Sequence, residues 1–159
     1  KQVEVVHTND RELANSLDFV QPLVTAKGVF FEGGRQWRLV DAYQGTRTEQ
    51  MFWQVLERGG VIGGSSAGAT IQGSFLARGD TRHNQIMVGD HQQGFGFLKN
   101  VTVDQHTLAR NRHYDMFQIL QERPELLGLS IDEMTGIVVT GDQFEVIEES
   151  YVLVYDGGF

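Results

Sequence analysis

Short apolar runs alternate with longer amphipathic stretches along the chain, and this alternation constrains the fold more than any other feature. The apolar runs predict strands at residues 3–6, 28–31, 61–64, 101–103 and 129–131. The amphipathic stretches predict helices at residues 10–26, 37–58, 67–76 and 114–121. Three further strands, in a terminal sheet or hairpin, are expected at residues 136–139, 144–147 and 152–155. Strands that alternate with helices of this length form βαβ units, so we expect an α/β fold with a mostly parallel sheet flanked by helices.

Length and composition restrict the class of protein. The chain has 159 residues, 40% of them hydrophobic and 21% charged, and we expect a single domain over residues 1–159. A formal net charge of −8 argues against a nucleic-acid partner, because a nucleic-acid binder presents a basic face. No apolar stretch approaches the roughly 20 residues of a membrane span, and the first residues do not form a signal peptide. The compartment is left open.

The absence of cysteine removes several kinds of chemistry. It excludes disulfides, a cysteine nucleophile and thiolate metal ligands. The histidines and acids also lack the spacing of metal-binding motifs such as H-E-x-x-H. We therefore expect neither a metal nor another cofactor.

Polar clusters follow four of the predicted strands. They lie at residues 33–36, 65–66, 104–106 and 132–133. Ligands of parallel α/β sheets bind beyond the carboxyl ends of the strands. If the strands are parallel, all four clusters converge on one edge of the sheet.

The segment Gly64-Ser65-Ser66-Ala67-Gly68 has the G-x-S-x-G pattern of a nucleophile elbow, in the strand-to-helix context that such an elbow requires. Ser66 is the predicted nucleophile. The Ala67 amide is the natural donor to an oxyanion, and Gly33 or Gly34 could supply a second N–H. The alternative interpretation is a turn in which Ser65 or Ser66 only caps a helix.

A serine nucleophile needs a base and an acid that orients the base. Of the five histidines, only His106 directly follows a predicted core strand, whereas His83 and His91 lie in a polar stretch that we expect to be an exposed loop. Glu133 is the first choice for the acid. Three alternatives stay open at this point, namely Asp132, Asp80 and Asp90.

Two arginines follow the predicted base closely. Arg110 and Arg112 could bind a carboxylate of the substrate, since a guanidinium matches carboxylate geometry in a bidentate way. If the segment is helical, the two side chains diverge, so only one of them is expected to face the site. The plainer interpretation is that both arginines are exposed to solvent.

Several blocks of the sequence resemble cyanophycinase-type members of peptidase family S51. They are G-G-R-Q at 33–36, G-G-S-S-A-G-A at 63–69, G-F-G-F-L at 94–98, D-Q-H at 104–106 and I-D-E at 131–133. The resemblance implies a serine exopeptidase on a fold like that of class I glutamine amidotransferases. It implies a triad of Ser66, His106 and Glu133, and a substrate pocket lined by Gln36, Asp104, Gln105, Arg110 and Arg112.

The family resemblance also implies a peptide substrate. Cyanophycinases cut a β-aspartyl-arginine polymer, and relatives of the dipeptidase E type cut after an N-terminal Asp. Two departures concern charge: Arg35 replaces an acidic residue of the family, and Asp115 stands near a position where cyanophycinase carries a further arginine. The chain also begins at what resembles the family's second strand, so we expect a sheet without the first βα unit.

Three functions therefore remain to be compared. The leading hypothesis is hydrolysis of aspartyl or β-aspartyl peptide bonds. The alternatives are a non-catalytic module that binds a peptide or amino acid, and a carboxylester hydrolase, which shares the elbow motif. A homodimer is compatible with all three.

Overall fold

The computed structural model describes residues 2–157. Its helices are α1 (Arg11–Ala14), α2 (Leu17–Thr25), α3 (Gln36–Tyr43), α4 (Arg47–Glu57), α5 (Ala67–Thr70) and α6 (Met116–Glu122). Its strands are β1 (Gly28–Phe31), β2 (Val61–Gly64), β3 (Gly73–Phe75), β4 (Leu98–Gln105), β5 (Leu127–Ile131), β6 (Thr135–Thr140), β7 (Gln143–Glu148) and β8 (Val152–Asp156). Within residues 2–157, no helix is long and apolar enough to cross a membrane.

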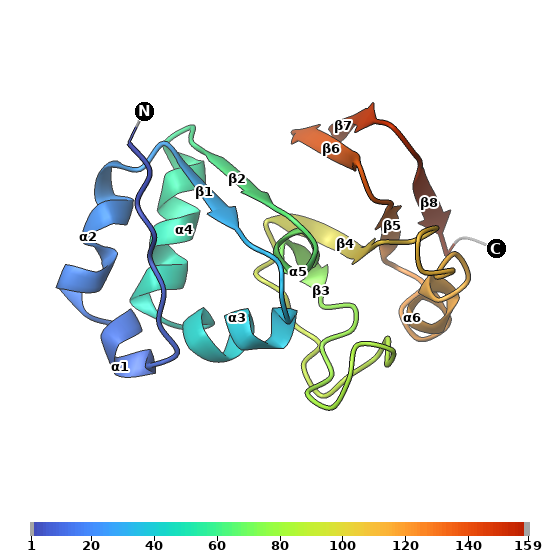
Figure 1. Cartoon of the computed structure of the whole chain (residues 1–159), viewed down its shortest axis with the longest axis horizontal. Coiled ribbons are helices and arrows are strands. Elements are labelled where there is room, and N and C mark those ends of the chain that lie inside the picture. Colours follow the sequence, from blue (N-terminus) through green and yellow to red (C-terminus); the bar gives the residue numbers. More distant parts are fainter. Residues whose placement is uncertain (1, 158–159) are drawn as a thin grey trace.

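The strands form a parallel pair, a mostly parallel unit of four strands, and one hairpin (Figure 1). β1 and β2 pair in parallel, and the second unit has the order β3-β4-β5-β8, in which β3, β4 and β5 are parallel and β8 is antiparallel. β6 and β7 form an antiparallel hairpin on the side of the molecule away from α2 and α4. The expected α/β architecture with a mostly parallel sheet is therefore confirmed.

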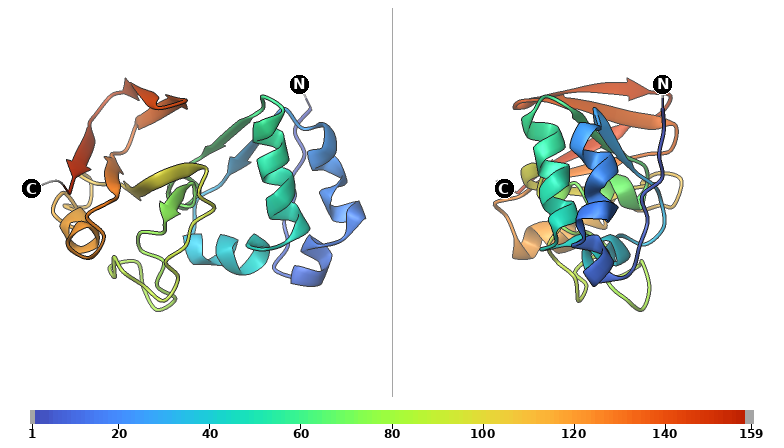
Figure 2. Two further views of the ribbon diagram at one scale, coloured as in Figure 1. Left: turned by 180° about the vertical axis from the view of Figure 1, so that it is seen from behind. Right: turned by 90° about the vertical axis from the view of Figure 1, so that its left-hand side faces the viewer.

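An aromatic core joins the helices to the β1–β2 pair. The Phe31 ring contacts the Phe52 ring edge to face, with centroids 5.0 Å apart, and lies 5.6 Å from the Phe95 ring. Tyr43 packs edge to face on Phe52 from the end of α3. Figure 2 shows α2 and α4 side by side, with α4 against the two strands. These rings bury large apolar areas, and they hold Phe31 and the glycines after it in place.

Two of the predicted helices are each divided in the structure. The stretch predicted at 10–26 separates into α1 and α2, because the Ser16 hydroxyl accepts a hydrogen bond from Phe19 N and starts a second helix. The stretch predicted at 37–58 separates into α3 and α4 at Gly45, which has φ +73. Thr46 caps α4 by accepting from Glu49 N, and Glu49 in turn accepts from Gly45 N. A capped boundary satisfies the free N–H groups of a new helix, so each break is stable.

Two other expectations about secondary structure were wrong. Residues 3–6 form no strand, and Val3 and Val5 are exposed there without a partner strand in the described chain. The helix predicted at 67–76 stops at Thr70, and the chain enters β3 at Gly73. A Cβ at Gly73 would crowd the Val101 carbonyl of β4, so the close pairing of these strands takes the place of further helix.

Candidate active site

Ser66 lies in a sharp turn between β2 and α5. It has φ 54 and ψ −115, a conformation that is costly for any residue with a Cβ. The flanking glycines explain how the turn fits. A Cβ on Gly64 would overlap the Gly68 carbonyl, and a Cβ on Gly68 would overlap the Phe31 carbonyl of β1. The backbone of α5 therefore packs directly on β1, and the turn presents the Ser66 side chain beyond the end of β2.

His106 and Glu133 follow the ends of β4 and β5. These strands are parallel and in register, with Gln105 opposite Ile131, so the residues that follow them emerge at the same edge. His106 Nε2 lies 2.9 Å from Ser66 Oγ, and His106 Nδ1 lies 3.0 Å from Glu133 Oε1. The proximity expected of these three side chains is present. A hydrogen bond to Glu133 sets the ring so that Nε2 accepts from the serine hydroxyl.

The surroundings of His106 favour its neutral form. Partial burial and the positive charge of Arg110 lower the pKa of His106, and the hydrogen bond and charge of Glu133 offset them only in part. A neutral imidazole can take a proton from a hydroxyl, whereas an imidazolium cannot. A His106 ring with a lowered pKa is therefore in the form that can accept a proton at neutral pH.

Backbone N–H groups lie on two sides of Ser66. Ala67 is the first residue of α5, and an N–H in the first turn has no partner within its own helix. Gly33 lies against the serine, since a Cβ built on it would sit 3.4 Å from Ser66 Cβ and 3.9 Å from Ser66 Oγ. Gly34 follows with φ +133, which a residue with a side chain rarely adopts. Two of the expected oxyanion donors, Gly33 and Ala67, thus lie next to Ser66, and Gly34 is the neighbour of Gly33 in the chain.

The acids left open as alternatives have other partners. Both oxygens of Asp80 bond Arg82, and Asp80 Oδ1 also accepts from the backbone at residues 82 and 83. Asp90 accepts from Thr81 and contacts His91. Both acids lie in the segment between β3 and β4, which was expected to be an exposed loop. Part of this segment is buried, including Asp80. Glu133 is the acid that contacts His106.

Arg112 is the inward arginine. It is only 2% exposed, and its Nη1 donates to the carbonyl and to Oε1 of Gln105, at 3.0 and 3.1 Å. Its Nε and Nη2 are buried and have no hydrogen-bond partner among the described residues. Burial lowers the pKa of the Arg112 guanidinium, and the nearby charge of Arg78 lowers it further. Arg110, by contrast, is exposed. Arg112 is thus a desolvated guanidinium in which two of the three nitrogen atoms have no acceptor among the described residues.

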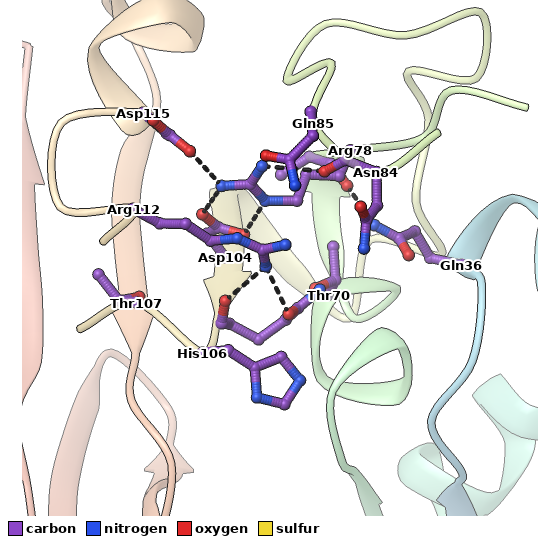
Figure 3. A network of polar contacts seen from close by, with 12 residues as sticks. Gln36, Thr70, Arg78, Asn84, Gln85, Asp104, His106, Thr107, Arg112 and Asp115 are labelled. Carbon is purple, nitrogen blue, oxygen red and sulfur yellow. Dashed lines mark hydrogen bonds and ion pairs between the residues drawn. The ribbon is translucent and has the colours of Figure 1, made fainter. Parts of the chain in front are cut away.

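A buried ion-pair network lies next to Arg112 (Figure 3). Arg78 is fully buried and binds Asp104 through two contacts, Nε to Oδ1 at 2.7 Å and Nη2 to Oδ2 at 2.8 Å. Nη2 also lies 2.6 Å from Asp115 Oδ2, and Nη1 donates to the Asn84 carbonyl. Burial lowers the pKa of Arg78, but the hydrogen bonds and charges of both acids more than offset it. In the view of Figure 3, Arg112 lies between this network and the His106 ring.

This network changes the expected pocket lining. Asp104 is fully buried and neutralised by Arg78, so it has a protein partner where a substrate contact was expected. Gln36 is also buried, and its Nε2 donates to the Ala77 carbonyl at 2.7 Å. Gln105 supports Arg112. All three residues are thus buried and hydrogen-bonded to groups of the protein itself. Arg78 was not predicted from the sequence. Its one signal there is Asp104, an acid near the end of a predicted core strand, which needs a cation if it is buried.

Comparison with known proteins agrees with this geometry. A profile of peptidase family S51 matches residues 1–147. The chain is 33% identical over 162 residues to a cyanophycinase of Geminocystis herdmanii, covering 99% of this chain and 59% of that one. It is 31% identical over 163 residues to a cyanophycinase of a Nostoc species, covering 98% of this chain and 54% of that one. The chain thus spans little more than half the length of these relatives.

Two solved structures share the fold. The crystal structure of a peptidase from an acI-B1 Actinobacterium matches with a TM-score of 0.71 and 25% identity, over 92% of this chain and 60% of that one. A putative peptidase E protein from Listeria monocytogenes matches with a TM-score of 0.62 and 16% identity, over 87% of this chain and 65% of that one. These matches agree with the expected fold of the class I glutamine amidotransferase type. The chain belongs to peptidase family S51.

Proposed function

We propose that this chain carries the active site of a serine peptidase that hydrolyses aspartyl or β-aspartyl peptide bonds. The observation that carries the proposal is the continuous line of hydrogen bonds from Ser66 Oγ through His106 to Glu133. A turn that only caps a helix has no need of this line, and the Ser66 side chain makes no capping hydrogen bond. The strained backbone at Ser66 supports the same interpretation, because such strain is common at catalytic residues.

The proposed reaction is acyl transfer in two halves. Ser66 Oγ attacks the scissile carbonyl carbon while its proton passes to His106 Nε2, and Glu133 stabilises the imidazolium through Nδ1–H. The Ala67 N–H and an N–H of Gly33 or Gly34 stabilise the oxyanion. The tetrahedral intermediate collapses as His106 gives its proton to the leaving amine. A water molecule, activated by His106, then attacks the acyl-serine carbonyl, which releases the carboxylic acid product and restores the Ser66 hydroxyl.

Specificity for aspartate is proposed to come from Arg112. A buried cation with two nitrogen atoms that have no acceptor is costly, and a substrate carboxylate would supply both the missing charge and the missing acceptors. Asp104 and Asp115 are bound by Arg78, and their charges only partly offset the effect of burial and of Arg78 on the pKa of the Arg112 guanidinium. The likeness to cyanophycinases, which act at aspartyl residues, supports this substrate class.

A fluorophosphonate probe tests the nucleophile, because it labels only activated serines. We expect labelling of the wild type and no labelling of Ser66→Ala. Ser65→Ala is the matched control, because it removes the hydroxyl of the exposed residue next to Ser66, and it should still be labelled. Turnover in Ser66→Ala should fall by about 10⁴-fold or more, with the circular dichroism spectrum unchanged. No labelling of the wild type would instead favour a non-catalytic binding module. In a substrate panel, hydrolysis of simple esters but not of aspartyl dipeptides would favour a carboxylester hydrolase.

A further inference from the structure

Asp132 directly precedes Glu133, and both of its carboxylate oxygens are occupied. Oδ1 accepts hydrogen bonds from the backbone N–H groups of Leu108 and Ala109, each at 3.0 Å. Oδ2 accepts from the Ser150 hydroxyl at 2.6 Å. Desolvation raises the pKa of Asp132, but these hydrogen bonds outweigh it and lower the pKa overall, so the carboxylate is ionised at neutral pH.

These bonds connect the segments that carry the base and the acid. Leu108 and Ala109 belong to the turn that follows His106, which itself leaves β4 with φ 57. Asp132 belongs to the turn that leaves β5 and carries Glu133. A second link runs in parallel, from the Thr107 hydroxyl to the Ile131 carbonyl at 3.4 Å. The backbone pairing of β4 with β5 ends at Gln105 and Ile131. Beyond that point, hydrogen bonds from side chains connect the turn after β4 to the turn after β5.

A third segment braces the same turn. Ser150, just before β8, donates through its hydroxyl to Asp132 and through its N–H to the Thr135 hydroxyl. Thr135 in turn donates to the Glu133 carbonyl at 3.2 Å. The backbone on both sides of Glu133 is therefore held by bonds that do not involve the Glu133 side chain.

We call these hydrogen bonds of Asp132, Thr107, Thr135 and Ser150 the brace. They matter because packing does not hold the Glu133 side chain in place. This side chain is 53% exposed and keeps most of its rotamer freedom, so its contact with His106 depends on a backbone position from which the ring is within reach. His106 is better packed, with a side chain 21% exposed. The 3.0 Å contact between His106 and Glu133 therefore depends mainly on how the two turns are held together.

We propose that Asp132 is a positioning residue, which holds the turns after β4 and β5 so that Glu133 meets His106. This inference rests on the proposed peptidase function. Asp132 does not act as the orienting acid itself, since both of its oxygens bond other groups and Glu133 makes the contact with the ring.

Three variants separate the brace from its charge. Asp132→Ala removes all three hydrogen bonds. Asp132→Asn keeps an acceptor for the two backbone N–H groups and can donate to the Ser150 oxygen, so it keeps the brace without the charge. Ser150→Ala removes only the bond to Oδ2. Asp142→Ala is the matched control, because Asp142 is an exposed acid at the tip of the β6–β7 hairpin.

Two measurements are made on each folded variant. The first is kcat and KM with an aspartyl dipeptide. The second is the titration of His106 in the resting protein by NMR, with its signal assigned by its loss in His106→Gln. The second readout does not depend on turnover, so it still tests the brace if the wild type proves inactive and the proposed function fails.

For Asp132→Ala we expect kcat to fall by about 10- to 100-fold with KM nearly unchanged, because a small misplacement of the base slows chemistry more than binding. The pKa of His106 should fall in the same variant, as the contact with Glu133 is lost. Asp132→Asn and Asp142→Ala should resemble the wild type in both readouts, and Ser150→Ala should shift them in the direction of Asp132→Ala. The proposal is overturned if Asp132→Ala folds with wild-type kcat and wild-type His106 titration. Should Asp132→Ala not fold, unchanged values in Ser150→Ala would overturn it equally.

Discussion

His106 Nδ1 lies 3.0 Å from Glu133 Oε1, while Nε2 of the same ring lies 2.9 Å from Ser66 Oγ. A ring nitrogen that faces a carboxylate carries the proton, so the nitrogen that faces the hydroxyl is free to accept. Glu133 thus selects the tautomer that the proposed reaction needs. The three residues come from the ends of three different strands, and His106 contacts both of the others.

Replacing Glu133 should affect both the rate and its pH dependence. In Glu133→Gln the anion that stabilises the imidazolium is lost, and we expect kcat to fall by about 10²- to 10⁴-fold. The hydrogen bond and charge of Glu133 raise the pKa of His106, so their removal should move the acidic limb of kcat/KM to lower pH. Glu145→Gln, an exposed position on β7, is the control. An unshifted limb in Glu133→Gln would mean that another acid serves His106.

Removing Arg110 should have the opposite effect on the pH profile. The charge of Arg110 disfavours the imidazolium and lowers the pKa of His106. In Arg110→Ala the pKa of His106 should therefore rise, and the acidic limb of kcat/KM should move to higher pH. The measurement belongs at low ionic strength, because salt screens an exposed charge. Lys99→Ala removes an equal charge near the far end of β4, and a shift of the same size there would contradict the assignment to Arg110.

The two arginines should differ in their effect on specificity. Arg112→Ala should remove most of the preference for an aspartyl over an asparaginyl peptide in kcat/KM, a loss of about 2–5 kcal/mol for an unpaired buried charge. Arg112→Lys should restore only part of it, since an ammonium lacks the planar fork of N–H donors. Arg110→Ala should leave the ratio unchanged, because Arg110 is exposed. An equal loss in both alanine variants would show that the carboxylate is bound elsewhere.

The Arg78 network predicts an asymmetry in stability. In Asp104→Ala the fully buried Arg78 loses its bidentate partner, and the free energy of unfolding should fall by about 3–5 kcal/mol. Asp115 has a side chain 28% exposed and makes one contact with Arg78, so Asp115→Ala should cost less than about 2 kcal/mol. Urea denaturation of both variants, with Asp142→Ala as control, measures the difference. Equal losses would mean that Arg78 is held mainly by other contacts.

The location of the candidate site could be predicted, because residues that follow parallel strands lie beyond the carboxyl ends of those strands. Ser66, His106 and Glu133 each follow a short apolar run, and they lie beyond the carboxyl ends of β2 in one unit and of β4 and β5 in the other. The choice of Glu133 over Asp132 depended on the family resemblance and on alternation along an extended segment, which points neighbouring side chains in opposite directions. In the structure the two acids do face different partners, the His106 ring and the turn after it.

Other features depended on signals that periodicity does not carry. The break between α3 and α4 is marked by Thr46 and Glu49, which have the spacing of a capping box, but the apolar pattern on either side is continuous. The partnership of Arg78 with Asp104 spans 26 residues and joins an irregular segment to a strand. Contacts of this kind are set by the tertiary fold, so no local pattern reports them.

The backbone contact between Gly68 and Phe31 also bears on how this sequence can change. Where two backbones touch, there is no side chain to exchange and no space to refill, so a substitution at Gly64 or Gly68 cannot be compensated by altering a neighbour. The segment between β3 and β4 has exposed positions that make no such contact. We expect the chain to tolerate variation at the exposed positions of that segment and to tolerate almost none at Gly64 and Gly68. New substrate preferences would then arise around a nucleophile whose own surroundings stay the same.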